Sequence, residues 1–281
     1  MTTGTALIIG ASGTTGTRIV AQLAAAGYRA NAASRRATAV AGATPVAFDW
    51  YDPSTHFDAL DGVDRVYLIP PLGESDPASV MLPFLKQARA VGVLRAVLLS
   101  SSAIARGGPA VGMVHDALPD LFDQWAVLRP SWFMQNFTGT HPHATSIRDH
   151  GTIWTAAGDG RVGFIDAGDI ASVAVHALTD EEAPNDELIL TGPEALSFDD
   201  IATRITEISD RPVAHRRLSY DHMVGRLSAL MPESFATMLT DMDVAIAEGS
   251  EDRVTDTVQR LTGQFPRSFR DLLAKETPWN H

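Results

Sequence analysis

Residues 7–16 have the sequence LIIGASGTTG. The first three residues continue an apolar run, and the segment that follows the stretch places apolar residues at Ile19, Val20 and Leu23, with the spacing of a helix. The stretch therefore predicts a strand, a tight turn and the start of a helix. Free backbone N–H groups and the positive end of the helix dipole attract phosphate at such a junction, so the turn is a candidate dinucleotide site.

The glycines of this stretch have separate physical roles in a dinucleotide site. Gly10 allows the tight turn off the strand, Gly13 lets backbone approach a pyrophosphate, and Gly16 lets the helix pack close to the sheet. The remaining candidate phosphate-binding residues of the turn are Ser12, Thr14 and Thr15. The alternative interpretation is an ordinary tight turn without a ligand.

The end of the second expected strand indicates which dinucleotide binds. The strand predicted over 28–33 ends at Ser34-Arg35-Arg36, where an NAD site usually carries an acid for the ribose 2′-hydroxyl. This chain has no acid there, and guanidinium groups pair with phosphate oxygens in a bidentate fork. We therefore predict NADP(H) as the cofactor; the alternative is a solvated basic turn.

Composition excludes several classes of protein. The chain has 281 residues, 45% of them hydrophobic, which is enough for a sizeable core. A net charge of −12 without a basic cluster argues against a nucleic-acid partner, and the lack of cysteine excludes disulfides and thiolate chemistry. No run of 18 apolar residues or signal segment is present, so we expect a cytoplasmic protein without a membrane partner. Composition leaves the formation of a homo-oligomer open.

Strand and helix patterns alternate along the first half of the chain. This alternation predicts an α/β fold, a Rossmann-type doubly wound parallel sheet, with a small and mostly helical C-terminal lobe. The further strands are expected over 45–48, 63–69, 96–100 and 125–128, with helices over 80–91 and 118–122. We expect residues 1–150 to form the NADP-binding core and residues 151–281 a substrate-binding lobe and lid, interleaved with the last core strands.

Ligands of parallel sheets bind beyond the carboxyl ends of the strands. This rule adds further candidate cofactor residues after the third, fourth and fifth strands: Asp49, Trp50, Ile69, Pro70, Pro71 and Ser100.

The C-terminal part has a different pattern. Two short β-like pieces, 152–156 and 162–165, precede Asp169, which we expect to cap a helix over 170–178, and Ser197 is expected to cap another. The segment 221–276 is predicted to be helical. Its apolar stripe is Met223, Leu227, Leu230 and Met231. This stripe is either ordinary core or an adaptable lid over a hydrophobic substrate.

Several motifs in a fixed order indicate a family. They are GASGTTG at 10–16, SR at 34–35, LIPP at 68–71, SSSA at 100–103, LRPSWFMQNF at 128–137 and FIDAGDIA at 164–171. Together they resemble the NmrA-like atypical short-chain dehydrogenase/reductases, and within that group the festuclavine/agroclavine dehydrogenase type. The resemblance covers about residues 5–190 and implies a Rossmann core that binds NADP(H) and a variable substrate lobe.

One departure from that family bears on mechanism. None of the four tyrosines lies four residues before either of the two lysines, so the usual Tyr–Lys acid pair is absent. Where relatives carry lysine before a Val–His segment, this chain has Met113 before Val114-His115. Ketone reduction needs a proton for the developing alkoxide, whereas an iminium carbon needs only hydride.

The resemblance and this departure together suggest a function. We expect an NADPH-dependent reductase that transfers hydride to a C=N (imine or iminium) bond, or to an activated C=C or C=O bond, of a hydrophobic small molecule. The alternative is a non-catalytic NADP(H)-binding redox sensor of the NmrA type.

Three residues are candidates for catalysis. His115 has an ordinary pKa suited to acid catalysis, but could equally be a helix-face histidine paired with Asp116 or solvent. Asp166 lies where the ergot-type reductases line their substrate pocket, and could also be a turn or cap carboxylate. Ser101 could bind a substrate heteroatom or merely satisfy the backbone at a strand end.

The aromatic residues Trp132, Phe133 and Phe137 are candidate substrate contacts, although core packing would give the same pattern. His141, His143 and His150 lack the spacing and the carboxylate partner of a metal site, so we expect no metal.

Overall fold

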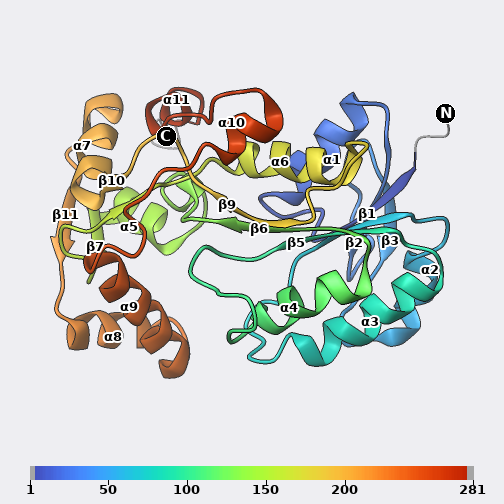
Figure 1. The fold of residues 1–281 in the computed structure, drawn as a ribbon. Coiled ribbons are helices and arrows are strands. Elements are labelled where there is room, and N and C mark those ends of the chain that lie inside the picture. Colours follow the sequence, from blue (N-terminus) through green and yellow to red (C-terminus); the bar gives the residue numbers. More distant parts are fainter. Residues whose placement is uncertain (1–3, 277–281) are drawn as a thin grey trace. The chain divides into compact units, whose positions relative to one another are not determined.

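The computed structural model describes residues 4–276, which belong to two compact units (Figure 1). Unit 1 consists of Met1–Pro130, Ala167–Leu190 and Thr257–Gln264, and unit 2 consists of Ser131–Asp166, Thr191–Asp256 and Phe265–His281. The chain crosses between the units several times. The first crossing comes earlier than the expected boundary at residue 150, because the chain enters unit 2 directly at the end of the sixth strand.

Unit 1 contains a seven-stranded sheet in which all neighbouring strands are parallel. Its strands are β1 (Thr5–Ile9), β2 (Arg29–Ser34), β3 (Thr44–Ala47), β4 (Arg65–Leu68), β5 (Arg95–Leu99), β6 (Gln124–Pro130) and β9 (Asp186–Leu190). The order across the sheet is β3-β2-β1-β4-β5-β6-β9. This is the predicted Rossmann-type arrangement, and every strand expected before residue 130 is present within a few residues of its predicted bounds.

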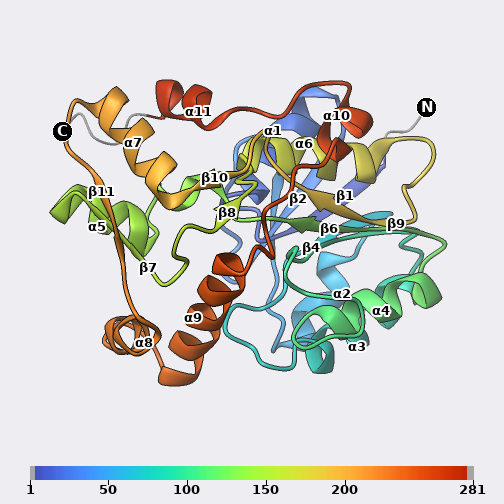
Figure 2. The ribbon, with the colours of Figure 1, turned by 60° about the vertical axis from the view of Figure 1, so that its left-hand side comes forward.

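Helices cover both faces of this sheet, because strands buried on both sides need two apolar layers (Figures 1 and 2). The helices α1 (Gly16–Ala25), α6 (Ala167–Thr179) and α10 (Thr257–Thr262) lie on one face. On the other face lie α2 (His56–Ala59), α3 (Ala78–Ala90) and α4 (Gly112–Leu121), and η1 (Pro53–Thr55) precedes α2. The predicted apolar positions of α1 (Ile19, Val20 and Leu23) are all wholly buried.

Unit 2 combines two small sheets with helices. Its strands are β7 (Thr152–Thr155), paired parallel with β11 (Ala214–Arg217), and β8 (Arg161–Val162), paired antiparallel with β10 (Leu196–Ser197). Its helices are η2 (Met134–Asn136), α5 (Pro142–His150), α7 (Phe198–Ser209), α8 (Tyr220–Ser228), α9 (Glu233–Ala247) and α11 (Phe269–Lys275). The two strands β10 and β11 have no counterpart in the sequence prediction.

Three local expectations for the C-terminal half have different outcomes. Ser197 caps α7 as predicted, with its hydroxyl accepting from the Asp200 N–H at 3.1 Å. Asp169 is not a helix cap, because α6 begins at Ala167 and therefore includes Asp169 in its first turn, where an acid favours the helix dipole. In the methionine-rich stripe, Met223 and Leu227 are buried but Leu230 is exposed.

No helix in the described part of the chain has the length and apolar character needed to cross a membrane.

Candidate functional site

The turn between β1 and α1 has the backbone geometry that its glycines predict. Gly10 adopts a φ of +73°, which side-chain-bearing residues rarely adopt. A Cβ on Gly16 would lie 2.2 Å from the Gly10 carbonyl oxygen, so α1 approaches the turn too closely for any other residue. A Cβ on Gly13 would lie 3.1 Å from the Gly10 carbonyl oxygen, which is a less severe contact. Gly16 therefore shapes the turn, whereas Gly13 leaves room on its outer side.

The outer side of this turn fits a pyrophosphate. Ser12, Gly13 and Thr14 are exposed, and α1 begins after Thr15 without a side-chain cap from any described residue. Uncapped N–H groups at a helix N-terminus are the usual partners of phosphate oxygens. The Thr15 hydroxyl, by contrast, is buried and accepts from the Tyr67 hydroxyl at 3.2 Å, so its side chain holds the turn against β4.

The basic turn after β2 presents two free guanidinium groups. The Ser34 carbonyl accepts from the Ala37 N–H at 3.1 Å, which makes 34–37 a β-turn with both arginines at its tip. Arg35 and Arg36 are exposed, and neither pairs with any other residue that the structure describes. The Ser34 hydroxyl accepts from the Thr38 N–H at 2.8 Å. The two arginines are thus available to a phosphate.

The candidate residues after β3 and β4 pack partly into the core. Trp50 is 8% exposed, and its indole N–H donates to the Ile69 carbonyl at 3.1 Å. A Cβ on Gly10 would lie 2.8 Å from the Ile69 side chain, so Ile69 packs directly against the glycine turn. These contacts give Trp50 and Ile69 a structural part in shaping the turn. Asp49, Pro70 and Pro71 lie at the same strand ends and keep partial exposure.

The serines that follow β5 are held by an arginine of β6. The Arg129 guanidinium donates to the Ser102 carbonyl at 2.9 Å and to the Ser101 carbonyl at 3.4 Å. The hydroxyl of Ser101 accepts from the Ala103 N–H at 3.3 Å, and the buried hydroxyl of Ser100 has no partner among the described residues. The Ser100 hydroxyl is therefore a buried side-chain donor without a described partner.

His115 lies on α4 and is almost completely buried. Its Nε2 is 3.5 Å from the Glu187 carboxylate, not beside Asp116, which pairs with Arg106 instead. Glu187 also accepts from Arg129 at 2.7 Å. Burial is the main cause that lowers the pKa of His115, and it outweighs the opposite effect of Glu187. The imidazole is therefore neutral at neutral pH and is not an acid that gives up a proton readily.

Asp166 lies in unit 2 and is completely buried. Its Oδ2 is 3.1 Å from the Arg267 guanidinium and accepts from the Gln135 amide at 3.2 Å. A carboxylate used in this way is an acceptor in an ion pair, which favours the structural alternative over a proton donor.

The aromatic candidates separate into two kinds. Phe137 is wholly buried and makes edge-to-face contacts with Phe164 and Phe269, with ring centroids 5.2 and 5.7 Å apart. It belongs to the core of unit 2, which favours the core-packing alternative for Phe137. Trp132 and Phe133 keep partial exposure, and a backbone bridge joins Phe133 to Ile165.

The histidines of α5 also have structural roles. The His141 ring accepts from the His143 N–H at 3.1 Å and caps the helix, and burial lowers the pKa of His143 to about 3. Within residues 4–276, no group of three or more His, Asp or Glu side chains has the arrangement of a metal site.

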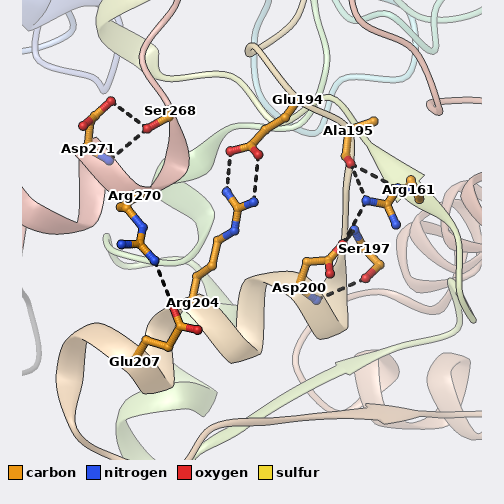
Figure 3. A network of polar contacts seen from close by, with 10 residues as sticks. All are labelled: Arg161, Glu194, Ala195, Ser197, Asp200, Arg204, Glu207, Ser268, Arg270 and Asp271. Carbon is orange, nitrogen blue, oxygen red and sulfur yellow. Dashed lines mark hydrogen bonds and ion pairs between the residues drawn. The ribbon is translucent and has the colours of Figure 1, made fainter.

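Unit 2 also carries a polar surface hollow of about 380 Å³ between α7 and α11 (Figure 3). Glu194 forms a two-point pair with Arg204, and Glu207 pairs with Arg270 at 3.0 Å. Because the charges that line the hollow are already paired with one another, they leave little for a ligand. A second hollow, of about 650 Å³, lies at the amino ends of β1 to β3, at the edge opposite to the glycine turn.

Sequence reasoning missed the partners of the two candidate acids. Glu187 and Arg129 of unit 1 surround His115, and Arg267 of unit 2 pairs with Asp166 across 101 positions of the chain. No local pattern marks such distant pairs.

Known proteins supply an independent comparison. Residues 10–181 match the model of a family described as NAD(P)H-binding. An uncharacterised oxidoreductase of Bacillus subtilis, YesF, is 44% identical over 95% of this chain and 93% of its own length. Agroclavine dehydrogenase of Claviceps fusiformis is 38% identical over 81% of each chain.

A solved structure agrees with the fold. An NADPH-dependent quinone oxidoreductase of Escherichia coli, crystallised with NADPH, is 24% identical and superposes with a TM-score of 0.80 over 96% of this chain and 99% of its own. The family model covers more than half of the chain, and the relatives cover most of it at more than 30% identity. The chain therefore belongs to the NAD(P)H-binding oxidoreductase family that its first strand, turn and helix predict.

Proposed function

We propose that this protein is an NADPH-dependent reductase that transfers hydride to a C=N bond, imine or iminium, of a hydrophobic small molecule. An activated C=C or C=O bond is the second substrate class. The observation that carries the proposal is the state of the two candidate acids, since His115 is buried and neutral and Asp166 is paired with Arg267.

Unit 1 holds the cofactor in this proposal. Its exposed turn at 12–14 and the uncapped start of α1 bind the pyrophosphate, and Arg35 and Arg36 bind the 2′-phosphate. The Ser100 hydroxyl, buried and without a described partner, is a donor for the nicotinamide half. Bound NADPH supplies the hydride.

The substrate must accept hydride without help from a strong protein acid. An iminium carbon meets this condition, because hydride neutralises its charge and no alkoxide develops. A relative at 38% identity is named agroclavine dehydrogenase, which supports a redox reaction on a small organic substrate. Trp132 and Phe133, the aromatic candidates that keep partial exposure, are the proposed substrate contacts, since aromatic faces bind organic cations.

The sensor alternative has less support. Relatives at 38 and 44% identity carry dehydrogenase and oxidoreductase names over most of the chain, which favours catalysis.

The test compares kcat/KM against pH for an N-alkylated cyclic iminium and for a cyclic ketone of similar shape. We expect the iminium to be reduced at a rate that changes little between pH 6 and pH 9, and changes less than about threefold in His115→Ala. The matched control is His176→Ala, a partly exposed histidine of α6. The ketone should be reduced poorly, because general acid catalysis typically contributes about 10²–10⁴-fold.

Two outcomes would contradict the proposal. Efficient ketone reduction that depends on His115 or Asp166 would restore an acid mechanism. Tight NADPH binding without turnover of any electrophile would favour the sensor.

A further inference from the structure

The connection that leaves β3 lies beside the turn that carries Arg35 and Arg36. Ser34 is paired in register with Ala47, and the Ser34 carbonyl accepts from the Phe48 N–H at 3.0 Å. The residues that follow Phe48 therefore leave the sheet at the same edge and next to the two free guanidinium groups. If the phosphate of a ligand binds these arginines, the groups of the ligand next to that phosphate would lie along this connection.

Two adjacent aromatic residues of the connection have opposite environments. Trp50 packs edge-to-face against Phe48 and Phe84, with centroids 4.9 and 5.3 Å away. Tyr51, the next residue, is 59% exposed. Exposure of a large flat ring costs hydration free energy unless something covers it. Trp50 is one of the candidate cofactor residues, but the exposed ring of this connection is that of Tyr51.

Two hydrogen bonds hold Tyr51, one from its backbone and one from its ring. The backbone N–H donates to the Asp49 carboxylate at 3.0 Å, and the ring hydroxyl donates to the Glu74 carboxylate at 2.8 Å. Glu74 in turn accepts from the Asp76 N–H at 3.0 Å, which ties it to the loop after β4. The hydrogen bond to Glu74 raises the pKa of Tyr51, so the phenol remains a donor. An exposed ring held in this way is an ordered surface, not a freely rotating side chain.

We propose that Tyr51 is the shelf on which the adenine ring of the dinucleotide stacks, and that Glu74 is the residue that positions it. The inference rests on the proposed binding of NADP(H) by unit 1. Every base has an apolar face that stacks on an aromatic ring, and a ring that is already fixed loses little freedom when the base arrives. Arg35, which follows β2, would then bind the 2′-phosphate, and Tyr51, which follows the neighbouring strand β3, would contact the base.

The experiment measures dissociation constants of three ligands for the full chain by titration calorimetry. NADPH carries all parts of the cofactor, adenosine 2′,5′-bisphosphate carries only the adenine half, and reduced nicotinamide mononucleotide carries only the other half. The variants are Tyr51→Ala, which removes the ring, Tyr51→Phe, which keeps the ring and removes the hydrogen bond, and Glu74→Ala. Phe57→Ala is the matched control, because Phe57 is an exposed aromatic residue in the same connection.

We expect Tyr51→Ala to weaken NADPH and adenosine 2′,5′-bisphosphate by about ten- to a hundredfold, the range that loss of one base–aromatic stack gives. Reduced nicotinamide mononucleotide should bind as to the wild type. Tyr51→Phe and Glu74→Ala should each weaken the adenine-bearing ligands by about two- to fivefold, and Phe57→Ala by less than twofold. Unchanged circular dichroism and Tm in each variant check that the fold is retained.

The inference would be overturned by wild-type affinity in Tyr51→Ala, by an equal loss for the nicotinamide fragment, or by an equal loss in Phe57→Ala. A Tyr51→Phe variant as weak as Tyr51→Ala would also overturn it, because the hydrogen bond and not the ring face would then be responsible. The proposed function is judged separately. If Arg35→Ala still weakens NADPH binding while Tyr51→Ala does not, the NADPH preference stands and only the stacking of adenine on Tyr51 is wrong.

Discussion

Candidate residues of the two units differ in exposure and in whether their side chains already have partners within the protein. In unit 1 the guanidinium groups of Arg35 and Arg36 are exposed and lack described partners, and the exposed turn at 12–14 leads into a helix without a described side-chain cap. In unit 2 the Asp166 carboxylate and the Phe137 ring are completely buried and have contacts on several sides. Free polar groups at strand ends can bind a ligand, whereas buried paired groups stabilise the fold.

This difference leads to a general expectation. Substitutions of the exposed candidate residues of unit 1 should change ligand affinity with little effect on the free energy of unfolding. Substitutions of the paired or buried polar residues of unit 2 should do the reverse. The predictions below test this division, beginning with the largest effect.

The glycine turn tests the division within unit 1 itself. Gly13→Val should abolish detectable NADPH binding, because its side chain fills the outer side of the turn, while the Tm falls little. Gly16→Val should lose both binding and stability, since its Cβ would lie 2.2 Å from the Gly10 carbonyl oxygen. Calorimetric titration with NADPH and thermal unfolding of both variants measure the two effects.

The contrast between the two glycines is the control in this experiment. Normal NADPH binding by Gly13→Val would show that the turn has no role in the cofactor site. A Gly16→Val variant as stable as the wild type would show that the close approach of α1 is not needed.

Arg35 provides the second prediction. Loss of a charge-assisted contact to phosphate costs about 1.5–3 kcal/mol, so Arg35→Ala should raise the Kd of NADPH by roughly ten- to a hundredfold. The Kd of NADH, which lacks the 2′-phosphate, should stay within twofold, and so should the Tm. Arg29→Ala is the matched control, because Arg29 is an exposed arginine at the opposite end of β2. Equal affinity of the wild type for both cofactors would contradict the predicted preference.

The fold of unit 1 could be predicted because its signals are local. The glycine spacing at 10–16, the apolar strands and the helical periodicity of α1 each depend on residues close together in the chain. The basic turn at 34–36 follows directly from the end of β2 in the same way. For such features, sequence order and spatial order are nearly the same.

The environment of the candidate acids could not be predicted, because it depends on distant partners. Glu187 of β9 lies near His115 of α4 only in the folded sheet, and Arg267, which pairs with Asp166, lies 101 positions further along the chain. The choice between Trp50 and Tyr51 was hidden for a similar reason. Two adjacent aromatic residues give the same local signal, and packing against distant residues such as Phe84 decides which is buried.

A buried carboxylate tests the stability side of the division in unit 2. Asp243 of α9 accepts from the Ala156 N–H at 2.8 Å, and burial raises its pKa to about 6. The unfolded chain ionises this group near pH 4, so the unfolded state releases its proton first and stability falls as the pH rises from about 4 to 6. Asp243→Asn removes this loss, because an amide oxygen accepts the same hydrogen bond without a charge.

We therefore expect Asp243→Asn to gain stability relative to the wild type by roughly 1–3 kcal/mol between pH 4 and pH 8. Urea unfolding at several pH values measures the difference, and Asp241→Asn, an exposed position on the same helix, should show less than about 0.5 kcal/mol. A pH-independent difference between the wild type and Asp243→Asn would contradict the assignment. NADPH affinity should be unchanged in both variants.

The smallest effects are expected in the ion-pair network of unit 2 (Figure 3). Arg204 meets Glu194 through two parallel contacts and is half-buried, whereas Arg270 and Glu207 are both largely exposed. A two-point, partly buried pair loses less to solvent screening, so Arg204→Ala should cost about 1 kcal/mol and Arg270→Ala less than about 0.5 kcal/mol. Urea unfolding at low and high salt measures both, and salt should reduce the smaller effect first.

If Arg270→Ala proved as costly as Arg204→Ala, exposure and geometry would not govern this network. If either variant weakened NADPH binding, the division between a binding unit and a structural network would itself be wrong.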